Sequence, residues 1–196
     1  SVLERERKIR PTIFVGVDNG TSTENPHDEA RSNEYLPYPD LPTTTLMNPH
    51  GKLFPKFLFE DVMPLVRARY RVSDEPIGLG GFSYGALAAL WAAMSRPGEI
   101  SRLLLESGPL QISHDRLIRD AHAVERWPRT VDIGVGTAET GDAAFDQHGV
   151  VLSAELARII RARGSRVRLV VDQDAQHDPA AWAARLPSAL RFLATP

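Results

Sequence analysis

The sequence has no cysteine among its 196 residues. This absence excludes disulfide bonds, zinc sites with cysteine ligands and a thiol nucleophile. An excess of charge of one sign is also missing, because 23 basic residues against 25 acidic ones give a formal net charge of −2. Such a balance offers no electrostatic footprint for nucleic acid or for an anionic membrane surface. We therefore expect neither as a partner, and no oligomeric state is indicated.

Long apolar segments are missing as well. No run approaches the roughly 20 residues that a membrane-spanning helix needs. Residues 1–8 are charged and lack the apolar stretch of a secretory signal, which predicts a cytoplasmic location. The remaining composition, with 42% hydrophobic and 24% charged residues, is that of a globular protein. At this length we expect one domain with its own core.

Short apolar runs alternate with segments of helical spacing. The runs, each expected to be a strand, are 12–17, 77–82, 103–108, 131–136 and 167–171. Helices are expected over 54–70, 86–94, 150–163 and 180–193. Pro64 predicts that the first of these helices is kinked or divided, because proline disrupts a helix interior. The alternation predicts an α/β fold, with a mostly parallel sheet and helices on both faces.

Residues 21–51 form a polar stretch that is rich in turn residues and has no periodicity. About 30 residues is long for a loop in a compact domain, and loops of this length are often functional. Loops at the ends of strands carry specificity in enzymes that are built on a rigid scaffold. We expect this loop to form part of a substrate rim.

The segment Gly81-Phe82-Ser83-Tyr84-Gly85 fits the pattern G-x-S-x-G of a nucleophile elbow, and it lies between an expected strand and an expected helix. In such an elbow the serine occupies a tight, strained turn, so the residues two positions away must be small. The following helix directs its N-terminus, with its free N–H groups, at the site. The pattern predicts Ser83 as a nucleophile and the Tyr84 N–H as one oxyanion donor, without indicating a second.

A serine hydroxyl needs a base to become a nucleophile. Only His177 lies just beyond the last expected strand, which is where an α/β-hydrolase places its base. The other histidines precede the elbow, lie in segments expected to cover the sheet, or open a helix: His27, His50, His114, His122 and His148. We expect His177 to be the base.

The base in turn needs an orienting acid, which should follow the fourth expected strand. The candidates by position are Glu139, Asp142 and Asp146. Asp172 and Asp174 lie in the same loop as the histidine and are less favoured. The residues by themselves leave the choice among the first three open.

Beyond the elbow, further segments share one resemblance. They are 11–19, the element Arg31-x-x-Glu34-Tyr35-x-Pro37, the helix at 57–64, and the closing stretch 177–193, where a histidine shortly precedes a tryptophan and the last helix. In this order they resemble the esterase family of α/β-hydrolases. That family holds enterochelin-type siderophore esterases, feruloyl esterases, S-formylglutathione hydrolases and mycolyltransferase antigens.

The resemblance implies an α/β-hydrolase fold and a serine esterase acting on a small-molecule ester, such as a siderophore or another acyl ester. The segment 136–139 is similar to the family's Gly-Thr-x-acid element, whose last position carries the triad carboxylate. It thus implies a triad of Ser83, Glu139 and His177, with Asp142 in reserve. Hydrolysis by such a triad needs neither a metal nor an organic cofactor.

Two alternatives stand beside the esterase. An acyltransferase of the mycolyltransferase type would share the acyl-enzyme, and an inactive α/β-hydrolase would serve as a binding module. In the family, the strand with the second oxyanion donor precedes the strand expected at 12–17, where this sequence has only eleven, mostly charged residues. We therefore expect residues 1–196 to be a single α/β-hydrolase domain that lacks N-terminal strands.

Overall fold

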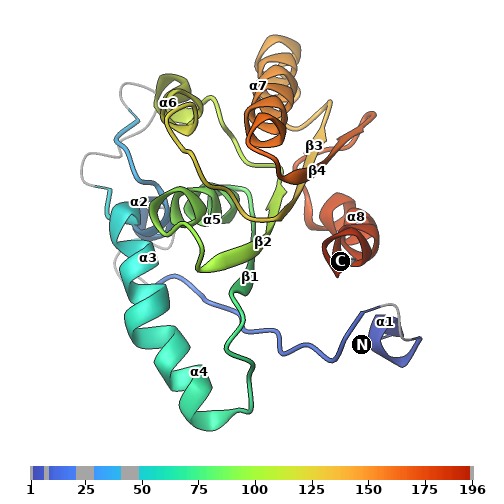
Figure 1. Ribbon diagram of the computed structural model, residues 1–196. Helices are drawn as coiled ribbons and strands as arrows, with labels where there is room; N and C mark the ends of the chain where they lie inside the picture. Colours follow the sequence, from blue (N-terminus) through green and yellow to red (C-terminus); the bar gives the residue numbers. More distant parts are fainter. Residues whose placement is uncertain (1, 7–8, 21–28, 41–48, 195–196) are drawn as a thin grey trace.

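The computed structural model describes residues 2–6, 9–20, 29–40 and 49–194. At its centre lies a four-stranded sheet in the order β1-β2-β3-β4, with every neighbouring pair parallel (Figure 1). The strands are β1 (Ile77–Phe82), β2 (Ile100–Glu106), β3 (Thr130–Gly136) and β4 (Arg166–Asp172). The expected α/β fold with a parallel sheet is confirmed.

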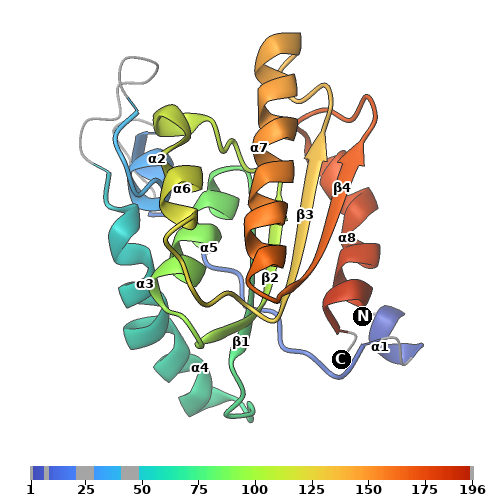
Figure 2. The same ribbon diagram turned by 45° about the horizontal axis from the view of Figure 1, so that its top comes forward.

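Helices cover both faces of the sheet. Because the strand order follows the chain order, right-handed crossovers place the connecting helices on one face. Figure 2 shows α5 (Tyr84–Ser95), α6 (Ile112–Ala121) and α7 (Ala143–Ala162) on this side of the strands. On the other side, α8 (Pro179–Ala194) packs against β2 and β3. Among the described residues, no helix is both long and apolar enough to cross a bilayer.

The larger core lies between the sheet and the helices α5, α6 and α7. Of these helices, α5 packs against β1 and β2. This helix is apolar around most of its circumference, and α2 (Glu29–Tyr35) and α3 (Phe54–Phe57) pack on its outer side. Its buried residues are Ala86, Leu87, Ala88, Ala89, Leu90, Ala92 and Ala93. A smaller apolar cluster under α8 consists of Leu104, Ala189 and Leu193. Because both faces of the sheet are buried in this way, the strands are held in place, and so are the carboxyl ends from which the functional loops emerge.

The helix expected at 54–70 forms, and its regular α-helical turns are interrupted just before Pro64. After the 3-10 turn η1 (Gly51–Leu53), α3 leads into a π-helical stretch, η2 (Leu58–Val62), and then into α4 (Met63–Arg69). Proline has no N–H, and its ring clashes with the carbonyl four residues earlier. A π-helical stretch just before the proline relieves this conflict without ending the helix.

The prediction of a strand at 12–17 is wrong. This segment has no regular secondary structure, and Ile13, Phe14 and Val15 are 47%, 62% and 48% exposed. An apolar, β-branched run becomes a strand only where a neighbouring strand pairs with its backbone. Within the described part of the chain, no strand lies beside it to do so.

Three helices occur where the sequence predicted none. They are α1 (Val2–Arg5), α2 within the polar stretch 21–51, and α6 between β2 and β3. Inside α6 the residues Ser113, His114 and Asp115 all have positive φ, so the right-handed helix is interrupted at its start and is regular only after them. Residues 21–28 and 41–48 of the polar stretch, including His27, lie outside the described residues.

Candidate active site

Ser83 lies in the turn between β1 and α5, at the carboxyl edge of the sheet. Its backbone has φ 55° and ψ −128°, a conformation that residues with a side chain rarely adopt. Its N–H donates to the carbonyl oxygen of Glu106 at 2.9 Å, so the pairing of β1 with β2 continues into the turn. This geometry is that of a nucleophile elbow, in which the serine hydroxyl stands above the sheet.

The two glycines of the elbow differ in what they permit. A Cβ at Gly81 would lie 2.0 Å from the carbonyl oxygen of Gly85, so β1 and α5 leave no room for a side chain there. A Cβ at Gly85 would meet nothing within 4 Å. The expectation that both positions must be small therefore holds for Gly81 and is wrong for Gly85.

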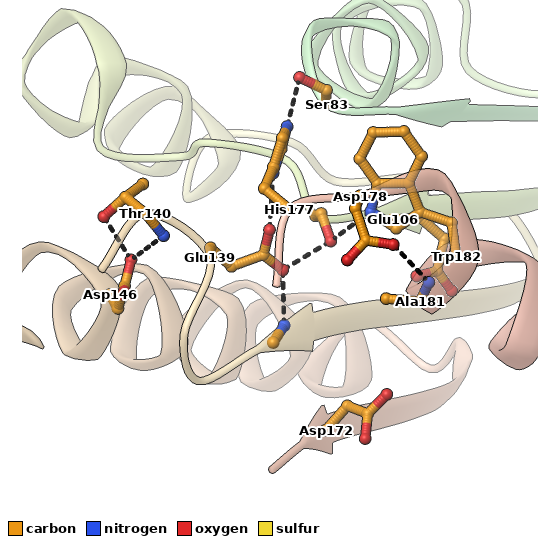
Figure 3. Close-up of polar contacts among 12 residues, drawn as sticks. Ser83, Glu106, Glu139, Thr140, Asp146, Asp172, His177, Asp178, Ala181 and Trp182 are labelled. Carbon is orange, nitrogen blue, oxygen red and sulfur yellow. Dashed lines mark hydrogen bonds and ion pairs between the residues drawn. The ribbon is translucent and has the colours of Figure 1, made fainter. Parts of the chain in front are cut away.

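His177 follows β4 and connects the elbow to an acidic side chain (Figure 3). Its Nε2 lies 2.9 Å from the Oγ of Ser83, and its Nδ1 lies 2.6 Å from Oε2 of Glu139. A carboxylate accepts only, so Nδ1 carries the proton and Nε2 is free to accept from the serine hydroxyl. The ring of Trp182 stands edge-on to the imidazole, with centroids 5.1 Å apart.

The loops after β3 and β4 are joined to each other. Three hydrogen bonds of 2.8 to 3.1 Å link them: Thr137 N to Asp172 O, Ala138 N to Ala175 O, and Asp174 N to Thr137 Oγ1. They extend the pairing of the two strands beyond the sheet. Glu139 and His177 are therefore carried by loops whose relative position is fixed.

The carboxylate of Glu139 is 10% exposed and accepts hydrogen bonds at both oxygens. Its Oε1 accepts from the Gly136 N–H and from the Ser107 hydroxyl, each at 2.6 Å. Burial favours the neutral acid, but the hydrogen bonds from His177, Ser107 and Gly136 outweigh it, so the pKa of Glu139 lies below its ordinary value. Glu139 is thus an anion at neutral pH.

Two of the other candidate acids form hydrogen bonds within the segment that follows β3. Asp142 caps α7, accepting from backbone N–H groups of its first turn. Asp146 is buried and accepts from the N–H and hydroxyl of Thr140 and from the N–H of Gly141 (Figure 3). Both side chains hold the segment that carries Glu139 and do not contact His177.

The remaining candidates also have contacts elsewhere. Asp172 forms an ion pair with Arg185 at 2.9 Å, and the side chain of Asp174 accepts from Gln173. Sequence reasoning missed Arg185, which gives no motif signal because its partners lie far from it along the chain. Of the five candidate carboxylates, the structure brings only Glu139 to the histidine.

Ser83 and His177 open on a cleft of about 430 Å³. Tyr84, the first residue of α5, also lines it, and the N–H of a first helical residue has no partner within the helix. The wall is mixed and includes apolar Ile112 and Phe145 besides polar groups. The polar lining includes Arg31, Gln111, Thr140 and Asp146. Arg31 belongs to the stretch expected to form the rim.

A parallel sheet with helices on both faces, and a serine in a strained turn after a strand, define a protein of the α/β-hydrolase class. The chain belongs to the esterase family, whose model, described as "Putative esterase", matches residues 2–193. It is therefore a carboxylic ester hydrolase, as the resemblance implied. No curated protein sequence matches it.

Solved structures share the fold at low sequence identity. The BES protein from Bacillus cereus matches with a TM-score of 0.77 and 18% identity over 100% of this chain and 74% of its own. The siderophore hydrolase EstB from Aspergillus nidulans matches with a TM-score of 0.70 and 20% identity, over 87% of this chain and 67% of its own. The enterobactin esterase FES from Shigella flexneri matches with a TM-score of 0.71 and 20% identity, over 98% of this chain and 46% of its own. This chain thus spans less than half of the last of these proteins.

The geometry of the elbow predicts that two similar substitutions change the stability of the protein by different amounts. Gly81→Ala is expected to lower the free energy of unfolding by about 2 kcal/mol or more, because the new Cβ would overlap the carbonyl of Gly85. Gly85→Ala is expected to change it by less than about 1 kcal/mol, because the space is empty. Urea unfolding followed by tryptophan fluorescence measures both. Equal losses in the two variants would contradict the assignment.

The lowered pKa of Glu139 predicts how its contribution to stability depends on pH. That contribution is present above the pKa of the unfolded acid, about 4.3, and is lost as the pH falls through the lower folded value. Glu139→Gln should therefore be less stable than the wild type at pH 6, and the difference should shrink at pH 3.5. Urea unfolding at both pH values tests this, and an equal difference at both would argue against it.

Proposed function

We propose that this esterase acts through an acyl-enzyme on Ser83, with His177 as the base and Glu139 as its orienting acid. The observation that carries the proposal is the continuous hydrogen-bonded chain from the Ser83 hydroxyl through both nitrogens of His177 to Glu139, opening on the cleft. A nucleophile, its base and an orienting third group within hydrogen-bonding distance are the parts that covalent acyl transfer needs.

The first half of the reaction forms the acyl-enzyme. Ser83 Oγ attacks the ester carbonyl carbon while Nε2 of His177 takes the hydroxyl proton. The developing oxyanion lies at the N-terminus of α5, where the Tyr84 N–H donates to it and the helix dipole favours negative charge. When the bond to the alcohol breaks, the imidazolium returns the proton to the leaving oxygen.

The second half releases the acid. Water attacks the acyl carbon and gives its proton to Nε2 of His177, and the same proton then restores the hydroxyl of Ser83. In both halves the anion of Glu139 stabilises the imidazolium and holds the Nδ1–H tautomer. The low pKa of Glu139 supports this role, because a neutral acid at this position would not stabilise the charge.

We further propose a siderophore or another acyl ester as the substrate. The mixed wall of the cleft suits an ester with one apolar part, against Ile112 and Phe145, and one polar part, against Arg31 and Gln111. Two relatives of the same fold are named for hydrolysis of a siderophore and of enterobactin, which supports the siderophore class. Enterobactin and a p-nitrophenyl ester series, compared by kcat/KM, separate the two substrate types.

Removing the nucleophile should abolish ester hydrolysis. Ser83→Ala is expected to lower kcat/KM for short p-nitrophenyl esters by at least about 10³-fold, since the acyl-enzyme has no other acceptor. Ser95→Ala, at the exposed far end of the same helix, is the matched control and should keep wild-type rates. Substantial residual activity in a folded Ser83→Ala variant would overturn the proposal.

Activation of Ser83 should depend on His177. A fluorophosphonate probe is expected to label Ser83 in the wild type, and the labelling rate should fall at least about 100-fold in His177→Ala, because the hydroxyl loses its base. Mass spectrometry of the digested protein locates the adduct. A label on another residue, or an unchanged rate without His177, would contradict the mechanism.

A further inference from the structure

Ser107 follows β2 and is 3% exposed. Its N–H donates to the carbonyl oxygen of Gly134 at 2.8 Å, which continues the pairing of β2 with β3. Its φ is 49°, in the left-handed region that favours glycine. A buried serine in a conformation better suited to glycine indicates that its hydroxyl has a use.

All three hydrogen-bonding positions of that hydroxyl are occupied. It donates to Oε1 of Glu139 at 2.6 Å, and it lies 2.9 Å from Nε1 of Trp182 and 3.1 Å from Nη2 of Arg185. The indole and the guanidinium can only donate, so both lone pairs of the oxygen are used by them. The single O–H must therefore point at Glu139.

Arg185 is itself held in place by acidic side chains. Its Nε donates to Glu106 at 2.8 Å and its Nη1 to Asp172 at 2.9 Å, and its own side chain is 6% exposed. Gly134 makes room for this contact, since a Cβ there would lie 2.4 Å from Oε2 of Glu106. The guanidinium thus presents Nη2 to Ser107 in a fixed direction.

Trp182 connects the same serine to the histidine. Its Nε1 donates to the Ser107 hydroxyl while its ring stands edge-on to the imidazole of His177. The first turns of α8 therefore contact both the base and, through Ser107, the acid.

We propose that Ser107 is a positioning residue of the esterase reaction: it holds the Glu139 carboxylate in line with His177, and Trp182 and Arg185 of α8 hold Ser107. The role rests on the proposed function, in which Glu139 orients the base. In this role Ser107 forms no bond to the substrate and acts through Glu139 alone.

Two variants of Ser107 separate positioning from stability. Ser107→Gly and Ser107→Ala both remove the hydroxyl, but glycine accepts the positive φ and alanine does so with strain. Ser107→Gly should therefore melt at a higher temperature than Ser107→Ala. Both should lose kcat for p-nitrophenyl acetate by the same factor, about 10- to 100-fold, because a displaced catalytic group costs rate in this range. If the more stable Ser107→Gly variant instead kept a higher kcat than Ser107→Ala, the loss of activity would follow the loss of stability, and the positioning role would be overturned.

A second readout observes the hydrogen bond directly. The proton between Nδ1 of His177 and Glu139 should give a far-downfield resonance in the wild type, and this resonance should move upfield or vanish in both Ser107 variants. Ser113→Gly is the matched control, because Ser113 also has a positive φ of 57° and its side chain bonds the Tyr38 carbonyl instead. It should keep both the resonance and the wild-type kcat.

The failures of the two proposals can be told apart. An active Ser83→Ala variant would overturn the proposed function itself. An inactive Ser83→Ala variant, together with Ser107 variants that keep the wild-type kcat and resonance, would overturn only the positioning role of Ser107.

Discussion

The hydrogen bonds that converge on the Glu139 carboxylate are the interactions on which the site depends. Parallel strands end at one edge of the sheet, so the loops after β1, β3 and β4 meet there with their side chains side by side. The Gly136 N–H and the Ser107 hydroxyl hold one oxygen of Glu139, which leaves the other directed at His177. These contacts keep the acid charged despite burial, and they fix the tautomer of the base that faces Ser83.

Charged residues share the space between the sheet and α8 with the small apolar cluster of Leu104, Ala189 and Leu193. Glu106 pairs with Arg185 and Asp132 with Arg168, and burial raises the pKa of both acids even though the arginines oppose it. Buried ion pairs of this kind contribute little net stability, because desolvation offsets the attraction. The Arg185–Glu106 pair instead fixes α8 to the end of β2, directly before Ser107, whose hydroxyl donates to Glu139. This position beside the site accounts for a costly arrangement.

Much of the fold could be predicted from local pattern. The apolar runs located β1 to β4, and the elbow placed Ser83 because its geometry is encoded in five consecutive residues. The prediction of a strand at 12–17 was wrong because a short apolar run reflects only the side chains, whereas a strand also needs a partner for its backbone. Position left Glu139, Asp142 and Asp146 equivalent, and family resemblance favoured the one that touches the histidine. The side-chain hydrogen bonds of Ser107 join residues 32 to 78 positions apart, so no local pattern indicates them.

In the proposed reaction the acyl group of the substrate is carried by Ser83. Rapid mixing with p-nitrophenyl acetate, acid quenching and mass spectrometry of the intact and digested protein test it most directly. If Ser83 is the nucleophile, we expect one acetyl group per molecule on the peptide that contains Ser83, formed in step with the first turnover of p-nitrophenol. Turnover without an acetylated protein, or acetylation at another residue, would contradict it.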